Sequence, residues 1–485
     1  MSKISRRVFL RRVNSATLLA TVASIGITCK AEDKETGETS EMESETPAKN
    51  PLLGIDTKAV VQAYKDRELE NFSDKQLFAY ASEIVSVPTV SWVSSFVGHA
   101  PLELLARQTL LGLLPSEHKE MARKRIVKCA ALYESAVPYV SDKAKKEDLK
   151  KYDSLDKARK HLAGRIEEQD EEGTLKAVKE IGVQYGSDKI LETLAPLALQ
   201  DLSSYSHAHI GVWLVDQHSP KDDALKLLSS PLTKIASKSD HHIKTPRKLA
   251  KTTEGELDKS VDKVESEFRA ILLKKVPKLE QRGGSLAAMM KSVDRSSVLQ
   301  DYFGELMKYS LNDEQVEAGF RAVNRICAST MLVRPTSNAK FGWSHCLTFP
   351  HAAWRLSKII KDRKFALACA LLFATAYRGM HEVDTVSNYS WTPKTSELEL
   401  SKALKSDPQV AASCAHRDAK DDPEAVKKTL AIEALRRHDA HNVKYLATCA
   451  DLCELDPKGT PTYLAAAAIL GSVWVKEFPK ADSDL

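Results

Sequence analysis

The longest apolar stretches of this chain have the composition of helices that are buried on every side. The segment 101–114, PLELLARQTLLGLL, is rich in leucine, and the segment 365–380, FALACALLFATAYRGM, consists mostly of small and apolar residues. Neither has the polar face of a surface helix, and both are shorter than the roughly 20 residues that a membrane span needs. No long stretch alternates apolar and polar residues as a β-strand does. The sequence therefore predicts an all-α protein, a large multi-helix bundle.

Length and composition indicate a folded protein larger than one ordinary domain. The chain has 485 residues, of which 43% are hydrophobic and 28% charged, so it can bury a sizeable core. Its formal charge of +5 is small for this length and argues against nucleic acid as a partner. We expect a helical N-terminal half over 56–220, a lysine-rich helical insertion or linker over 221–300, and a helical C-terminal half over 301–485.

The N-terminus resembles an export signal. Residues 5–11, SRRVFLR, have the form of a twin-arginine signal, and an apolar run too short to span a bilayer follows over 16–28. Cys29 closes this run in a weak lipoprotein motif, and cleavage nearby without acylation is the alternative. We expect a signal peptide over 1–29, a disordered acidic tether over 30–55, and a periplasmic or membrane-anchored protein that engages the twin-arginine export machinery.

Familiar catalytic and binding motifs are absent from the sequence. No GxGxxG, GxxxxGK, GxSxG or HExxH occurs in the required context, which argues against the usual nucleotide sites, serine hydrolases and metalloproteases. Cys449 and Cys453 share a helix face, but no second cysteine pair accompanies them, so a zinc site there is improbable. The chemistry must be sought among the histidines.

The stretch 341–355, FGWSHCLTFPHAAWR, places two histidines in an apolar setting. His345 and His351 would point roughly 120° apart on an unbroken helix. Pro350 removes an N–H and usually kinks a helix, so we expect both rings to turn toward one pocket. The alternative is that each imidazole only hydrogen-bonds a neighbouring helix.

Three further histidines stand in apolar, helical context: His99, His207 and His441. His207 and His209 would lie about 200° apart on a helix, so one of them at most faces a given pocket, and we favour His207. His441 and Lys444 share a helix face. Because neutral imidazole is the commonest protein ligand for iron, copper and zinc, facing helices could present these residues to one metal ion.

The segments around these histidines resemble the questin oxidase-like family, named for fungal enzymes that oxidatively open anthraquinone rings. Residues 99–101, HAP, resemble its His-x-Pro, and residues 345–351, HCLTFPH, have the spacing of its His-Ala-Val-Thr-x-x-His. Residues 441–444, HNVK, resemble its His-Val-Ile-Lys. Residues 206–208, SHA, stand where the family has Phe-His-Gly, which is a departure from the pattern. The order of the motifs agrees over about 95–474.

The resemblance implies a mainly helical oxygenase that uses molecular oxygen on quinone-like or aromatic substrates, with oxidative ring cleavage. It also implies a non-haem iron held by histidines, with a carboxylated lysine as a further ligand. The matching positions are His99, His207, His345, His351, His441 and Lys444. Outside the cytoplasm a reduced nicotinamide cofactor is scarce, which favours incorporation of both oxygen atoms.

Two groups of residues near these motifs are candidates for supporting roles. The aromatic residues that could line a substrate pocket are Trp343, Trp354 and Tyr377. The residues that could orient metal ligands from behind are Arg378, Glu382 and Asp439. The alternatives are ordinary core packing for the aromatics and mutual pairing for the charged residues. For the whole chain, the alternative to an oxygenase is a non-catalytic extracytoplasmic helical lipoprotein or ligand-binding scaffold.

Overall fold

The computed structural model describes residues 50–88, 95–137, 148–201, 207–237, 244–274, 286–333, 339–380 and 391–479. The twin-arginine segment, Cys29 and Glu382 lie outside these ranges, so the predictions made for them stay predictions. Residues 50–55, which we expected to belong to the tether, already pack on the folded body. Leu52 is fully buried, and the Asn50 amide donates to the Tyr80 carbonyl at 2.9 Å and to Glu83 at 2.8 Å.

The described residues form helices and contain no β-strand, only an isolated bridge between Glu256 and Ser310. The all-α prediction is confirmed. No helix in these ranges has the length and apolar character that crossing a membrane requires.

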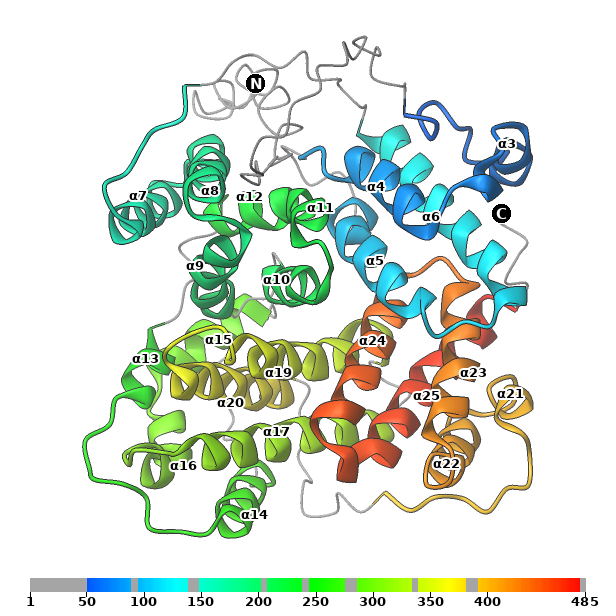
Figure 1. Cartoon of the computed structure of the whole chain (residues 1–485). Helices are drawn as coiled ribbons and strands as arrows, with labels where there is room; N and C mark the ends of the chain where they lie inside the picture. The colour runs from blue at the N-terminus through cyan, green and yellow to red at the C-terminus, as the bar shows by residue number, and fades with distance from the viewer. Residues whose placement is uncertain are drawn as a thin grey trace, which may run out of the picture.

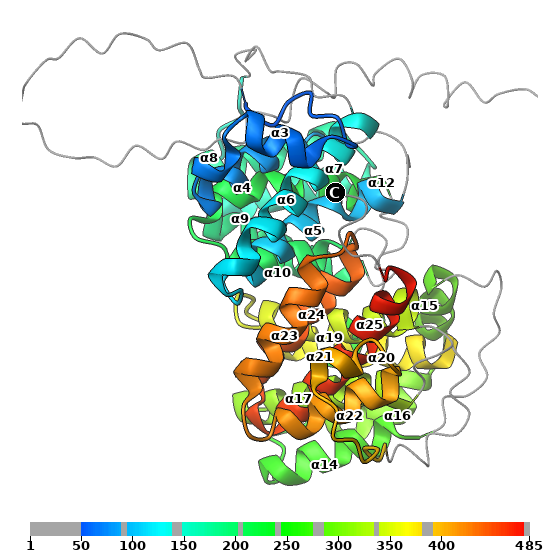
Figure 2. The ribbon, with the colours of Figure 1, turned by 90° about the vertical axis from the view of Figure 1, so that its right-hand side faces the viewer.

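The helices form two tiers, stacked one above the other in Figures 1 and 2. The upper tier consists of α3 (Val60–Asp66), η1 (Leu69–Asn71), α4 (Asp74–Val85), α5 (Ser95–Leu111), α6 (Ser116–Ala136), α7 (Leu155–Glu167), α8 (Glu171–Tyr185), α9 (Ser187–Gln200), α10 (Ala208–Gln217), α11 (Lys221–Leu225), η2 (Lys226–Leu228) and α12 (Ser229–Ser237).

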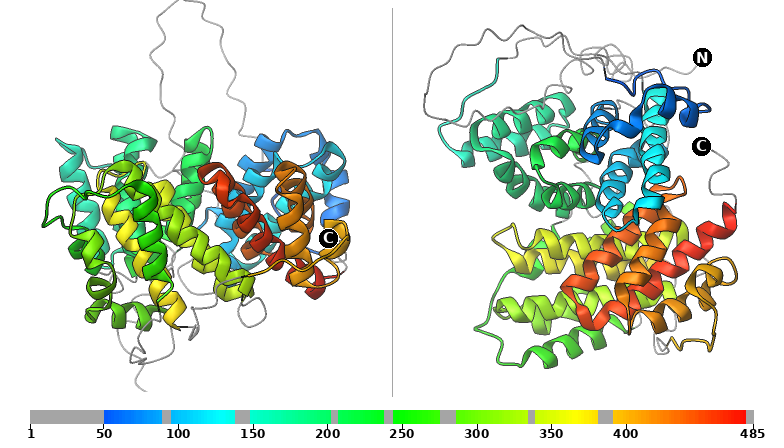
Figure 3. Two further views of the ribbon diagram at one scale, coloured as in Figure 1. Left: turned by 90° about the horizontal axis from the view of Figure 1, so that it is seen from below. Right: turned by 45° about the vertical axis from the view of Figure 1, so that its right-hand side comes forward.

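The lower tier consists of α13 (Thr245–Ala250), α14 (Val261–Leu272), α15 (Leu286–Arg295), α16 (Val298–Met307), α17 (Asp313–Val333), the π-helical turn η4 (Ala339–Trp343), α19 (Ser344–Leu356), α20 (Arg363–Met380), α21 (Leu400–Ala403), α22 (Pro408–Asp418), α23 (Pro423–Leu435), α24 (Ala440–Leu455), η6 (Pro457–Gly459) and α25 (Thr460–Glu477). The right-hand view of Figure 3 shows the same two tiers. The lysine-rich segment 221–300 contributes helices to both tiers.

Local sequence signals explain where many of the helices begin. Ser73 and Gln76 form a reciprocal capping box at the start of α4. Asp407 and Asp422 cap α22 and α23 with their carboxylates, and each is followed directly by a proline at the first helical position. These short-range contacts satisfy backbone N–H groups that have no partner within the helix.

One helix boundary differs from the sequence-based expectation. The helix expected from Pro101 begins at Ser95, so Pro101 and His99 both lie inside α5. A separate break divides α16 from α17. The break follows from Asn312, whose side-chain oxygen accepts from the Gln315 N–H at 2.9 Å and starts a new helix.

Four helices at the centre of the molecule make the largest contacts between the two tiers. Helices α5 and α10 belong to the upper tier, α19 and α24 belong to the lower tier, and α5 packs on α24 while α10 packs on α19 (Figure 1). The histidines described below lie on these four elements.

Candidate functional site

Four histidines converge where the tiers meet. The ring of His99 lies 4.5 Å from that of His207 and 4.8 Å from that of His441, measured between ring centroids. The ring of His345 lies 5.1 Å from that of His207 and 5.2 Å from that of His441. We call His99, His207, His345 and His441 the histidine cluster. The fold brings these residues together although up to 342 positions separate them in the sequence, from 99 to 441.

Each member of the histidine cluster comes from a different element. His99 lies within α5, and His207 is the residue before α10, where it adopts a left-handed backbone conformation with φ of 51°. His345 is the second residue of α19, and His441 is the second residue of α24. A non-glycine residue with positive φ is uncommon, and the surrounding packing must hold it there. His207 is therefore placed by its neighbours and not by its own preference.

The spacing of the four rings is compatible with a shared metal ion. If imidazole nitrogens bind an ion at about 2.1 Å, two ring centroids lie roughly 4.6 Å apart for ligands at right angles and roughly 6.4 Å apart for opposite ligands. The four adjacent separations are 4.5 to 5.2 Å, and His99 and His345, which face each other across the cluster, are 6.5 Å apart. The side chains as they stand are not yet in a ligating arrangement. Among the described residues, no three His, Cys, Asp or Glu side chains present their donor atoms to one position.

Lys444 contacts the histidine cluster at His99. Its Nζ lies 3.2 Å from Nδ1 of His99, and only 2% of the residue is exposed. Burial lowers the pKa of Lys444 to about 8, although Asp439 and Glu103 act in the opposite direction. Near neutral pH a fraction of this amine is therefore uncharged, which is the form that can accept carbon dioxide or a metal ion.

Three imidazoles of the cluster, those of His99, His207 and His441, favour their neutral form. Burial lowers the pKa values of His99 and His207 well below the ordinary 6.5, and the positive charge of Lys444 lowers both further. Burial also lowers the pKa of His441, against the effect of Asp439. Neutral imidazole is the metal-binding form. Nδ1 of His207 is buried and has no hydrogen-bond partner among the described residues, so one donor atom of the cluster is unsatisfied.

Two acidic residues, Asp439 and Glu103, lie beside the histidine cluster and help to position it. Asp439 caps α24 by accepting from the Asn442 N–H at 2.8 Å, and its other oxygen lies 3.4 Å from Nδ1 of His441. A carboxylate in such a contact can fix the orientation of an imidazole, which is the role predicted for Asp439. Glu103 lies one turn after His99 and pairs with Arg107 at 2.7 Å.

That ion pair fixes α5 against the end of α23. Arg107 donates to the Leu435 carbonyl at 3.1 Å and to the Arg437 carbonyl at 2.6 Å. Burial alone would raise the pKa of Glu103. Arg107 and His438 nevertheless hold this pKa well below its usual range. The charged pair therefore stays ionised in the interior, and it sets the position of His99 relative to α24.

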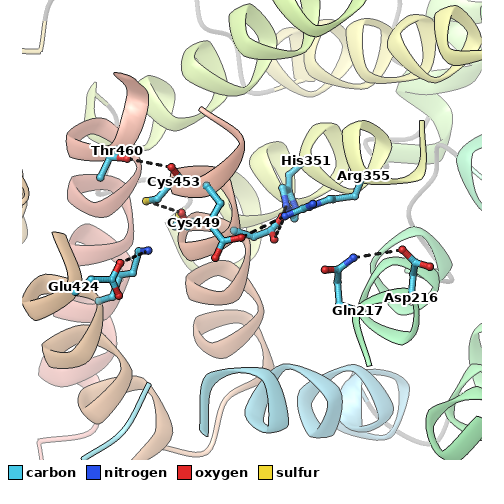
Figure 4. Close-up of polar contacts among 11 residues, drawn as sticks. Asp216, Gln217, His351, Arg355, Glu424, Cys449, Cys453 and Thr460 are labelled. Carbon is cyan, nitrogen blue, oxygen red and sulfur yellow. Dashed lines mark hydrogen bonds and ion pairs between the residues drawn. The ribbon is translucent and has the colours of Figure 1, made fainter. Parts of the chain in front are cut away.

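His351 does not join the cluster, contrary to the expectation from Pro350. The helix α19 runs unbroken past Pro350, so His345 and His351 keep the divergent directions of a regular helix. Nε2 of His351 lies 2.5 Å from the Asp451 carboxylate, and its ring packs edge-on against Trp213 at 4.3 Å. Arg355, beside it on α19, donates to the same carboxylate (Figure 4). His351 thus belongs to a contact between α19 and α24.

The three aromatic residues expected at a substrate pocket divide between two environments. Trp354 stacks on Phe320 at 5.8 Å and donates from Nε1 to Glu317, so it faces α17 and packs as a core residue. Trp343 and Tyr377 are buried, with ring centroids 6.5 Å apart. Tyr377 continues a stack through Phe373, at 5.3 Å, toward the cluster.

The stack reaches the neighbourhood of the histidines through His209. Phe373 stacks on Phe349 at 4.3 Å, Phe349 contacts His209 at 4.5 Å, and the His209 ring lies 6.2 Å from that of His207. His207, as favoured, is the member of the pair that contacts the other cluster rings. Arg378, by contrast, donates to the Leu272 carbonyl, which joins α20 to α14.

Sequence reasoning missed Lys234. Its pKa is lowered to about 8 by burial, and its charge lowers the pKa values of both His99 and Lys444. A Cβ atom added to Gly98 would lie 2.5 Å from Lys234 Nζ, which places this amine against α5 beside the cluster. The signal was an apolar surrounding, SSPLTKIAS, in which a lone lysine stands.

Comparisons with protein families, with curated proteins and with solved structures gave no significant match. The site is therefore interpreted from its own geometry.

Proposed function

We propose that this chain is a metal-dependent oxidoreductase, an oxygenase of quinone-like or aromatic substrates. The observation that supports it is the histidine cluster: four imidazoles from four elements, with ring separations compatible with one shared ion, and a buried lysine in contact with His99. Burying several titratable groups together costs folding free energy, so such a cluster is a common mark of a functional site.

The residues proposed to hold the metal are His99, His207, His345 and His441, with Lys444 as a further ligand after carboxylation. Imidazole suits iron, copper, zinc and nickel, and the resemblance to the questin oxidase-like family favours non-haem iron. A bound redox-active ion would supply the activation of molecular oxygen. The chain's own part is to orient the imidazoles, with Asp439 accepting a hydrogen bond from Nδ1 of His441, and to limit the access of bulk water by burial.

For binding, the contact between Lys444 and His99 must open. The Lys444 amine now occupies the side of His99 that carries Nδ1. The Lys444 ammonium would first lose a proton, and the neutral amine could then bond to carbon dioxide with loss of a second proton to solvent. The anionic carbamate would offer oxygen ligands in place of a cation that repels a metal ion. The lowered pKa of Lys444, about 8, makes this conversion accessible near neutral pH.

Metal analysis of the purified full chain tests the proposal. We expect about one iron per chain, loss of that iron in the double variant His345→Ala/His441→Ala, and retention in His351→Ala. His351 is the matched control because it is buried, lies on α19 as His345 does, and is not a member of the histidine cluster. Oxygen uptake with a hydroxyanthraquinone should follow the iron content. If the protein takes up no metal and the double replacement leaves its stability unchanged, the oxygenase proposal fails. The alternative function is then that of a helical binding scaffold.

The location is a separate proposal that rests on residues 1–29. We propose export by the twin-arginine route to the periplasm, with anchoring through Cys29 if that cysteine is acylated. Replacing Arg6 and Arg7 by lysine should retain the protein in the cytoplasm. Replacing Cys29 by alanine should release an acylated protein from the membrane fraction.

A further inference from the structure

A second site lies elsewhere between the two tiers. A cavity of about 320 Å³ lies between α7 and α9 of the upper tier and α13 and the start of α20 of the lower tier. None of the residues that line it belongs to the histidine cluster. Its volume falls at the small end of the range for pockets that bind small molecules.

The acidic groups of this cavity are already engaged. Glu192 pairs with Arg159 at 3.2 Å, and Arg159 also donates to Thr193 at 3.1 Å. Asp362 caps α20 by accepting from the Phe365 N–H at 2.9 Å. Neither carboxylate is therefore available to balance a further cation.

Two cations of the cavity have no acidic partner among the described residues: Arg247 and Lys361. The guanidinium of Arg247 lies 4.7 Å from the centre of the Phe365 ring. With the Gln200 amide turned to satisfy its hydrogen bonds, its oxygen accepts from Arg247 Nε at 2.7 Å and from Nη2 at 3.1 Å. These contacts hold the guanidinium in place without neutralising it, and they leave Nη1 for a ligand.

The rest of the lining is apolar. Pro196 and Leu197 come from α9, and Ile359 and Ile360 come from the segment between α19 and α20. All four are half-buried, so each offers part of its surface to a molecule in the cavity. An occupant that covers them gains apolar burial, while an anionic group on it meets Arg247.

We propose that this cavity binds a small aromatic carboxylate, with the carboxylate at Arg247 and Lys361 and the ring between the apolar side chains of Leu197 and Ile360. The proposal does not depend on a metal in the histidine cluster. It assigns a separate site to a different part of the junction between the tiers.

Calorimetric titration of the full chain with 2-naphthoate and with the neutral 2-naphthamide tests it. We expect naphthoate to bind measurably and the amide to bind at least about tenfold more weakly, since a charge-assisted contact is lost. Arg247→Gln should weaken naphthoate binding by about the same factor and leave the amide unaffected. Lys248→Gln is the matched control, because Lys248 is the next residue of α13, is also exposed and does not line the cavity.

Several outcomes would overturn the proposal. These are no binding of naphthoate at millimolar concentration, equal binding of acid and amide, or an equal loss in Arg247→Gln and Lys248→Gln. Because Arg247 is exposed, its replacement should leave the circular dichroism unchanged. Naphthoate binding that persists in folded His345→Ala/His441→Ala supports this separate site, whereas its loss there would assign the ligand to the histidine cluster.

Discussion

The side-chain nitrogen of Lys444 lies 3.2 Å from Nδ1 of His99, although 345 positions separate the two residues in the chain. This contact joins α24 of the lower tier to α5 of the upper tier inside the histidine cluster. When both are charged, a buried amine and a buried imidazole repel each other and lower the stability of the fold. Among the described residues no carboxylate lies between Lys444 and His99 to offset this repulsion. The contact fits a site in which neutral His99 accepts from the Lys444 amine, or in which both groups bind a third species.

Replacing Lys444 should stabilise the metal-free protein. The pKa of Lys444 is lowered from 10.5 to about 8, so the folded state holds this proton less tightly than the unfolded chain does. The penalty is complete below pH 8, where it amounts to about 3 kcal/mol, and it disappears as the pH rises to about 10.5. We expect Lys444→Met, after removal of metal by a chelator, to gain up to that amount in the free energy of unfolding at pH 7 and almost nothing near pH 10.5.

Urea denaturation at the two pH values measures this difference. Lys427→Met is the control, because Lys427 is also largely buried but pairs with Glu424 at 2.8 Å. It should bring no gain at pH 7. If Lys444→Met gains the same free energy of unfolding at both pH values, the buried charge of Lys444 is not the cause of the gain.

The ion pair that holds His351 should support stability and not metal binding. Burial alone would raise the pKa of Asp451, but His351 and Arg355 lower it to about 2 from the ordinary 3.8. A carboxyl with a lowered pKa contributes stability above its unfolded pKa and loses it as the pH falls toward the folded one. We expect Asp451→Asn to lose about 2 kcal/mol or more of the free energy of unfolding at pH 7, with the deficit shrinking between pH 4 and pH 2.

Urea denaturation from pH 7 downward tests this, with Glu454→Gln as the control. Glu454 lies 3.7 Å from the same Arg355 but is mostly exposed, so its replacement should change stability by less than about 1 kcal/mol. Iron content should stay the same in both variants. A loss of iron in Asp451→Asn at normal stability would return His351 to the candidate ligands.

The close packing of α17 on α20 depends on Gly319. A Cβ atom at this position would lie 2.7 Å from one methyl carbon of Leu367 and 3.0 Å from the other. We expect Gly319→Ala to lower the free energy of unfolding by about 1 to 3 kcal/mol through overpacking. Gly304, within α16, has no atom within 4 Å of such a Cβ, so Gly304→Ala should instead stabilise by about 0.5 to 1 kcal/mol. Thermal unfolding of the pair checks both signs, and a shared sign would refute the packing argument.

Trp354 should behave as a core residue and not as a substrate contact. Trp354→Phe loses the hydrogen bond to Glu317 and part of the stack on Phe320. We expect a loss of about 1 to 3 kcal/mol in the free energy of unfolding. The KM for an aromatic substrate should stay unchanged in oxygen-uptake assays. A raised KM at wild-type stability would place the indole at the substrate.

The local part of the fold could be read from the sequence because it depends on neighbouring residues. The leucine- and alanine-rich stretches became α5 and α20, and the aspartates and serines that precede many helices cap them. Pro350 was misjudged for a physical reason. A proline removes one hydrogen bond, but buried packing on both sides of α19 keeps the helix continuous.

The sequence by itself determined that the chain is helical and which histidines stand in apolar surroundings, since periodicity and capping act over a few residues. Only the tertiary structure decided that His99, His207, His345 and His441 meet while His351 pairs with Asp451. The same holds for Lys234 beside the cluster and for the cavity at Arg247. The physical reason is that these neighbours come from separate helices, and their distances are set by how the two tiers pack, which no local pattern in the chain encodes.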